Sequence, residues 1–176
     1  RDVPTLLRAI HDARRSFPVL ADFESRGQLA LWHDRGGALG LVTVNRGHGS
    51  VLRVATPAGD PWPGVAALRL PANWTGHAEL ALDARLQAPA PDSLRLAIRV
   101  DDYEARNDSQ WASRSYTVTH AWRTLRFPLA GLHTRGQGRL LQLDDIFALN
   151  VFLVRPPAAA AFELDNVRLE SAGAGD

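Results

Sequence analysis

The sequence predicts an all-β protein, a two-sheet antiparallel β-sandwich with one short N-terminal helix. Apolar and polar residues alternate in short segments from residue 19 onward, which is the pattern of strands that bury one face. Clusters of Gly, Pro, Asn and Asp separate these segments at the spacing typical of β-sandwiches. The chain has 176 residues, 45% hydrophobic and 22% charged, which suits one domain with a single core.

The helix is predicted over residues 4–15, followed by a series of short strands. Pro4 suits a first helical turn, and Leu6 and Ile10 lie on one apolar stripe. Pro18 ends the helical segment. The predicted strands are 19–24, 29–33, 39–44, 50–56, 65–70, 78–86, 94–101, 113–120, 122–128, 146–154 and 162–170.

These elements divide the chain into three parts. Residues 1–18 are expected to form the helix and a linker, residues 19–170 the β-sandwich, and residues 171–176 a flexible tail. Alternation along the strands also assigns the core. The residues expected to be almost fully buried are Leu82, Leu96, Ile98, Phe127, Val151 and Leu164.

The composition excludes several classes of function. Cysteine is absent, so disulfides, thiolate metal sites and cysteine nucleophiles are excluded. Every basic residue is arginine, which excludes chemistry that depends on lysine. A net charge of +1 gives no reason to expect nucleic-acid binding, and no apolar run is long enough to span a membrane. Because no methionine is present, we expect a processed form or a piece of a longer protein.

Four segments together resemble the jelly rolls of carbohydrate-binding modules, in the galactose-binding-domain-like superfamily. Residues 19–24 (Val-Leu-Ala-Asp-Phe-Glu) and 162–169 (Phe-Glu-Leu-Asp-Asn-Val-Arg-Leu) resemble the first and last strands of that group. Residues 72–80, which contain Asn-Trp-Thr-Gly, and residues 121–129, which contain Trp-Arg-Thr-Leu, resemble two of its inner strands. The order and spacing of these segments carry the resemblance, which covers about residues 19–170.

A narrower resemblance concerns the parent protein. Residues 98–103, 114–116 and 139–146 resemble the jelly rolls appended to VanZ-like bacterial membrane proteins, where the domain lies outside the membrane segments. The resemblance implies an extracytoplasmic domain, periplasmic or at the cell surface, that is fused to or near a membrane segment. We expect the domain itself to be monomeric.

The family resemblance also implies a structural calcium ion. Carboxylates at the positions of Glu24 and Asp165 often bind calcium in that group, with help from a turn that here contains Arg46 and Ser50. Calcium prefers several oxygen ligands, which carboxylates and turn carbonyls supply. An alternative is that Glu24 pairs with an arginine such as Arg46 or Arg168 while Asp165 caps a bulge. The positive charge of Arg46 favours this alternative, because it would repel a cation bound at the turn.

The tryptophans fall into two groups. Trp32, Trp74 and Trp122 lie in or beside strands with apolar partners, so core packing is the favoured interpretation for them. Trp62 lies between two prolines, and Trp111 follows a polar segment, so both are expected on loops. An exposed loop aromatic can stack on a sugar ring, whereas the alternative is that it covers one end of the sandwich.

Residues 99–114 form the most polar stretch beside a predicted core strand. Planar polar groups next to aromatic rings suit sugar hydroxyls, which both donate and accept hydrogen bonds. Strand parity sends Arg99, Asn150 and Phe152 away from the core, so they can share one groove with that stretch. The alternative is a solvated loop with Asp–Arg pairs. The predicted ligand-binding residues are Arg99, Asp101, Tyr103, Trp111, Arg114, Asn150 and Phe152.

No arrangement of residues favours catalysis. The acidic pair Asp101 and Asp102 is adjacent in the sequence, so the two side chains point to opposite faces of a strand and cannot flank one bond. The histidines show no metal-binding spacing, and no nucleophile elbow is present. The resemblance therefore implies a non-catalytic module that binds a glycan or cell-envelope polysaccharide weakly through a concave sheet. The alternatives are a protein-interaction or assembly domain and, more weakly supported, a jelly-roll glycan hydrolase or lyase.

Overall fold

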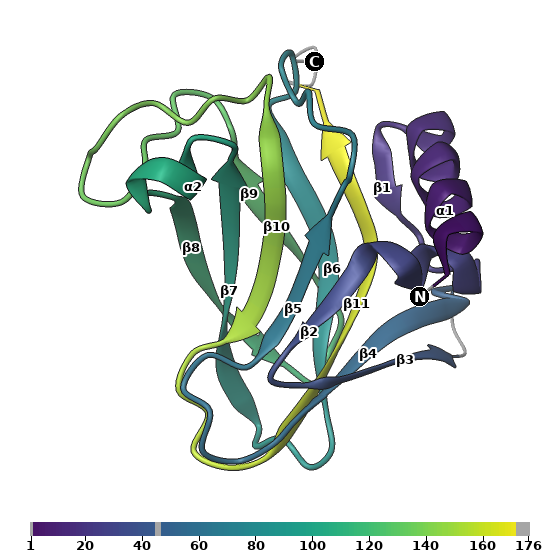
Figure 1. The fold of residues 1–176 in the computed structure, drawn as a ribbon. Helices are drawn as coiled ribbons and strands as arrows, with labels where there is room; N and C mark the ends of the chain where they lie inside the picture. Colours follow the sequence, from purple (N-terminus) through teal and green to yellow (C-terminus); the bar gives the residue numbers. More distant parts are fainter. Residues whose placement is uncertain (1, 45–46, 172–176) are drawn as a thin grey trace, which may run out of the picture.

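The computed structural model describes residues 2–44 and 47–171, which form two antiparallel sheets packed face to face (Figure 1). One sheet has the order β3-β4-β11-β6-β9, with β1 also paired to β11, and the other has the order β2-β5-β10-β7-β8. The elements are α1 (Val3–Ser16), β1 (Val19–Ala21), η1 (Arg26–Leu31), β2 (Trp32–Arg35), β3 (Ala38–Thr43), β4 (Ser50–Thr56), β5 (Gly64–Leu68), β6 (Glu79–Gln87), β7 (Ser93–Asp102), α2 (Ala105–Asp108), β8 (Ala112–Thr119), β9 (Arg123–Pro128), β10 (Ile146–Leu153) and β11 (Ala160–Glu170). The predicted β-sandwich is thereby confirmed.

One predicted strand is largely wrong. Residues 29–33 were expected to be extended, but the 3-10 helix η1 occupies Arg26–Leu31 and β2 begins only at Trp32. The Ser25 side chain caps η1, because its hydroxyl accepts a hydrogen bond from the Gly27 N–H at 3.2 Å. This local capping competes with strand formation in a segment whose apolar residues fit either structure.

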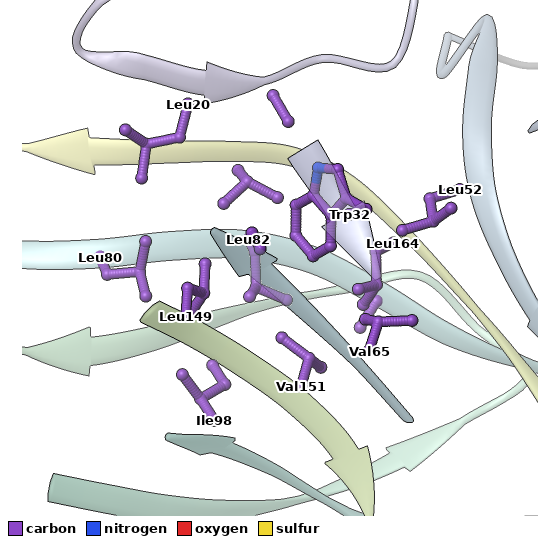
Figure 2. Close-up of a cluster of buried hydrophobic side chains, with 14 of the residues drawn as sticks. Leu20, Trp32, Leu52, Val65, Leu80, Leu82, Ile98, Leu149, Val151 and Leu164 are labelled. Atoms are coloured by element: carbon purple, nitrogen blue, oxygen red, sulfur yellow. The ribbon is translucent and has the colours of Figure 1, made fainter. Parts of the chain in front are cut away.

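The core lies between the two sheets (Figure 2). The side chains that parity assigned to it are buried, with exposed fractions of 0–1% for Leu82, Leu96, Ile98, Phe127, Val151 and Leu164. Trp32 and Trp74 are fully buried as expected. Trp122 is not a core residue: it precedes β9, is partly exposed, and stacks on His48 with ring centroids 4.0 Å apart.

Helix α1 packs on the sandwich through a narrow face of small residues. The Asp2 side chain caps it by accepting a hydrogen bond from the Thr5 N–H at 2.8 Å. Ala9 and Ala13 are buried in the core cluster, and the helix lies beside β1 (Figure 1). Among the described residues, no helix has the length and apolar character needed to cross a membrane. Of the predicted tail, only residue 171 lies within the described residues.

A buried ion pair fixes the loops at one end of the five-stranded sheet. Asp102 ends β7 and is fully buried, and Arg139 donates to both of its carboxylate oxygens at 2.5 and 2.8 Å. Arg139 also donates to Asp108 of α2 at 2.6 Å. Burial alone would raise the pKa of Asp102, but the hydrogen bonds from Arg139 and from the Gln142 and Ala105 N–H groups together lower it. The segment between β9 and β10 is thus tied to α2 and β7.

We expect Ile98→Ala to lower the free energy of unfolding by about 2–5 kcal/mol, because Ile98 is fully buried between the sheets and the truncation leaves a cavity. Urea unfolding at neutral pH measures this loss. Leu140→Ala is the matched control, since Leu140 is 57% exposed and its truncation should change stability by no more than about 0.5 kcal/mol. Equal losses in the two variants would show that the register of β7 is wrong.

We expect Arg139→Gln to cost roughly 3 kcal/mol at pH 7, because it leaves the buried Asp102 carboxylate without its charged partner. The lowered pKa of Asp102 stabilises the native chain above the pKa of an unfolded aspartate, and this contribution disappears as pH falls through the lowered value. In the variant the lowering effect of Arg139 is lost and the pKa of Asp102 rises, so the deficit should shrink toward pH 4. Urea unfolding at both pH values tests this, with the exposed Arg95→Gln as control. A deficit independent of pH would contradict it.

Candidate ligand-binding pocket

A pocket of about 460 Å³ opens on the outer face of the five-stranded sheet. Strand β10 runs through the middle of this sheet, between β5 and β7. Because alternate residues of a strand face opposite sides, the residues next to the buried Val151 and Ile98 project outward into the pocket region. The residues that line the pocket are Arg35, Trp62, Arg99, Trp111, Ser113, Arg135 and Phe152.

Small residues keep this face hollow. Ala66 of β5 is the strand partner of Asn150, Ala97 of β7 is the partner of Phe152, and Ser113 of β8 is the partner of Arg99. Gly64 at the start of β5 also has no room for a side chain, since an added Cβ would lie 2.2 Å from a main-chain oxygen of β10. These short residues leave space beside the large side chains that line the pocket.

The buried carboxylate of Asp101 orients the polar floor. Arg99 donates to it through Nε at 2.6 Å and Nη2 at 2.9 Å, and the Asn150 amide donates to the same carboxylate at 3.3 Å. The Asn150 carbonyl in turn accepts a hydrogen bond from Arg35 Nη1 at 2.7 Å. Asp101 and Asn150 are 8% and 4% exposed, so these bonds form away from bulk water. A continuous row of planar groups thus crosses the sheet from β7 to β2.

Aromatic side chains enter the pocket from opposite ends of the sheet. Trp111 directly precedes β8, is partly exposed, and has the Arg99 guanidinium 3.8 Å from its ring centroid. Trp62 precedes β5, is 43% exposed, and meets Phe152 edge to face at a centroid distance of 6.2 Å. Arg155 lies 5.3 Å from the centroid of Trp62. Each tryptophan has a guanidinium over its ring, but Trp62 is exposed whereas Trp111 is half-buried, so Trp62 is the more accessible stacking surface.

Main-chain and side-chain hydrogen bonds hold the loop that carries Arg135 against the loop that carries Trp111. The Arg135 N–H donates to the Trp111 carbonyl at 2.8 Å. The Thr134 hydroxyl donates to Gln110 Oε1 at 2.8 Å, and Thr134 is buried. Together with the Asp102–Arg139 pair, these bonds place the exposed Arg135 side chain at the rim of the pocket.

The structure brings five of the seven predicted ligand-binding residues together, namely Arg99, Asp101, Trp111, Asn150 and Phe152. Tyr103 lies elsewhere, because the chain turns into α2 after β7 and the ring packs edge to face on Phe147 at 5.7 Å. Arg114 also lies elsewhere. It is the strand partner of the inward-facing Ile98, so Ser113 takes the outward position on β8.

The sequence interpretation did not assign Trp62, Arg35 or Arg135 to the site. Trp62 carried a usable signal, since an aromatic between two prolines directly before a strand is poorly placed for the core. Arg35 reaches the site only because β2 pairs with β5, and Arg135 only because its loop folds back onto Trp111. Neither long-range pairing has a local signature in the sequence.

The expected calcium ligands lie around one turn on the other sheet. Glu24 Oε1 accepts a hydrogen bond from the Ser50 N–H at 3.0 Å, and Asp165 Oδ2 lies 2.7 Å from His48 Nδ1. Burial raises the pKa of Asp165, against the lowering effect of His48. Arg46 lies outside the described residues, so its expected role has no structural account.

Calcium requires several oxygen ligands, and the oxygens of Glu24 and Asp165 described above are already in hydrogen bonds. Both carboxylates are met by nitrogen donors, and the Gly49 carbonyl already accepts a hydrogen bond from the Val44 N–H at 2.8 Å. Within the described ranges, no three His, Asp or Glu side chains gather as metal ligands. Arg168 pairs with Glu170, so the described residues do not support the alternative pairing of Glu24 with Arg168. Calcium binding stays a prediction.

No protein-family model matches the sequence, and no curated protein matches it. Solved structures do match. An exo-β-agarase superposes with a TM-score of 0.73 at 16% identity, covering 90% of this chain and 25% of the agarase. The chain thus spans about a quarter of the length of that enzyme.

Carbohydrate-binding modules match over nearly their whole length. The family 11 module from Clostridium thermocellum, solved in complex with a β-1,3-1,4-mixed-linked tetrasaccharide, gives a TM-score of 0.63 at 20% identity, with 88% of this chain and 95% of the module covered. A family 30 module from a cellulosomal cellulase of the same organism gives 0.56 at 17% identity, with 81% and 87% covered. The chain therefore has a fold similar to that of carbohydrate-binding modules.

Proposed function

We propose that this chain is a non-catalytic carbohydrate-binding module that holds a glycan in the pocket on the five-stranded sheet. The observation that carries the proposal is the pocket itself, in which two partly exposed tryptophans flank a fixed row of hydrogen-bonding groups. An aromatic face suits the C–H side of a sugar ring, and planar amide and guanidinium groups suit its hydroxyls. The fold similarity to carbohydrate-binding modules supports the same function.

Weak binding is part of the proposal. Trp62 keeps 43% of its surface exposed at the pocket, so a ligand would not be fully enclosed. Among the described residues that line the pocket, none is acidic, and the nearby Asp101 carboxylate is bound by Arg99. A hydrolase of the two-carboxylate type needs two acids flanking the scissile bond. The pocket therefore supports binding better than hydrolysis. The extracytoplasmic location and the link to a membrane protein stay predictions.

We expect Trp62→Ala to weaken glycan binding about tenfold or more, because it removes the most accessible stacking ring. Native affinity gels containing agarose, mixed-linked β-glucan, polygalacturonate or dextran sulfate identify a polymer that retards the native chain, and the variant is then compared on that polymer. Tyr103→Ala is the matched control, since Tyr103 is 49% exposed but lies outside the pocket.

The two variants separate the possible outcomes. Loss of retardation in Trp62→Ala alone supports the pocket as the glycan site. Equal losses in both variants would show that binding does not occur there. If none of the four polymers retards the native chain, the proposal of a carbohydrate-binding module is overturned and the protein-interaction alternative takes its place.

A further inference from the structure

Arginine dominates the charge of the pocket. Three guanidinium groups line it, those of Arg35, Arg99 and Arg135, and a fourth, Arg155, lies against Trp62. Asp101 is the carboxylate paired with this group, and it binds Arg99. Asp60, whose carboxylate accepts a hydrogen bond from the Trp62 N–H at 2.8 Å, adds a second negative charge. Four positive and two negative charges leave a local excess of two, whereas the whole chain carries a net charge of only +1. The pocket therefore carries an excess of positive charge.

Several arginines elsewhere on the sandwich form ion pairs with carboxylates. Arg53 and Arg85 both bind the buried Glu163, Arg126 binds Glu79 and Glu170, and Arg168 also binds Glu170. Such pairs supply an arginine with both an opposite charge and hydrogen-bond acceptors. Most arginines of the pocket are not paired in this way.

The pocket arginines keep unused donors. Arg35 is bonded to the neutral Asn150 amide, which does not compensate its charge. Within residues 2–44 and 47–171, no carboxylate lies within salt-bridge distance of Arg35, Arg135 or Arg155. Arg99 uses Nε and Nη2 for Asp101, so Nη1 lies outside that pair. A guanidinium presents paired N–H donors that match the geometry of an oxyanion.

We propose that the ligand of this pocket is an anionic glycan, whose sugar units carry a carboxylate or a sulfate ester. This inference rests on the proposed glycan-binding function and specifies its substrate class. The oxyanion is bound by Arg135 at the rim, with Arg99 and Arg35 on the floor, while the sugar ring stacks on Trp62. A neutral glycan would leave the net positive charge of a partly enclosed site uncompensated, which favours an acidic ligand over its neutral counterpart.

Matched polymer pairs test the charge requirement with the whole 176-residue chain. Polygalacturonate is compared with fully methyl-esterified polygalacturonate, and dextran sulfate with dextran, by native affinity gels at low salt and at about 0.3 M NaCl. We expect at least one anionic polymer to bind roughly tenfold or more tightly than its neutral partner, and added salt to weaken that binding. The first pair reports on carboxylates and the second on sulfate esters.

Two arginine variants distinguish polymer binding in the pocket from non-specific electrostatic attraction to the protein surface. Arg135→Gln should weaken binding of the anionic polymer severalfold to tenfold and reduce its salt dependence, because one oxyanion contact is lost. Arg15→Gln is the matched control, since it removes the same charge from the exposed surface of α1 and should leave binding unchanged.

The remaining outcomes of these experiments would contradict the inference, and each one shows which part of it is wrong. Equal binding of the charged and neutral members of each pair, or binding of neutral polymers only, overturns the anionic ligand but leaves the glycan-binding function intact. Equal weakening by Arg135→Gln and Arg15→Gln overturns the pocket as the anion site. Binding of no polymer at all overturns the proposed function together with this inference.

Discussion

The proposed site depends on one buried carboxylate. Asp101 is buried beside Arg99 on β7 and accepts hydrogen bonds from Arg99 and Asn150, which brings an arginine and an amide into fixed orientations on neighbouring strands. From these two residues the network extends to Trp111 on one side and to Arg35 on the other. Burial strengthens these bonds and makes an unpaired member costly. The planar groups of the pocket are therefore preorganised before a ligand arrives, which reduces the ordering cost of binding.

Other parts of the fold hold this hydrogen-bond network in place, although their residues do not belong to it. The core between the sheets fixes the register in which Asn150 lies opposite Arg99 and Phe152 opposite Ala97. At one end of the sheet, the Asp102–Arg139 pair ties α2 and the loop of Arg135 to β7. The adjacent acids Asp101 and Asp102 thus serve different purposes on opposite faces of one strand. One orients the pocket, and the other anchors the loops around it.

The sequence predicted those features that depend on local pattern. Period-two alternation placed most strands within one or two residues and correctly assigned buried residues such as Ile98 and Phe127. Parity also placed Arg99, Asn150 and Phe152 on one outer face. The prediction from alternation failed in η1, where local hydrogen bonding determines the structure. It also failed at Tyr103, where the chain leaves β7 and parity no longer applies. Arg35 and Arg135 could not be assigned, because pairing between distant strands and loops brings them to the pocket.

The central claim is that a glycan occupies the outer face of the five-stranded sheet. Mapping amide chemical shifts by NMR during titration with an acidic oligosaccharide, such as an oligogalacturonate, tests this claim most directly. Our account predicts that the perturbed amides cluster on β2, β7 and β10 and around Trp62, Trp111 and Arg135, with little change on the six-stranded sheet. Perturbations centred on α1, or on the outer face formed by β4, β6 and β11, would contradict it.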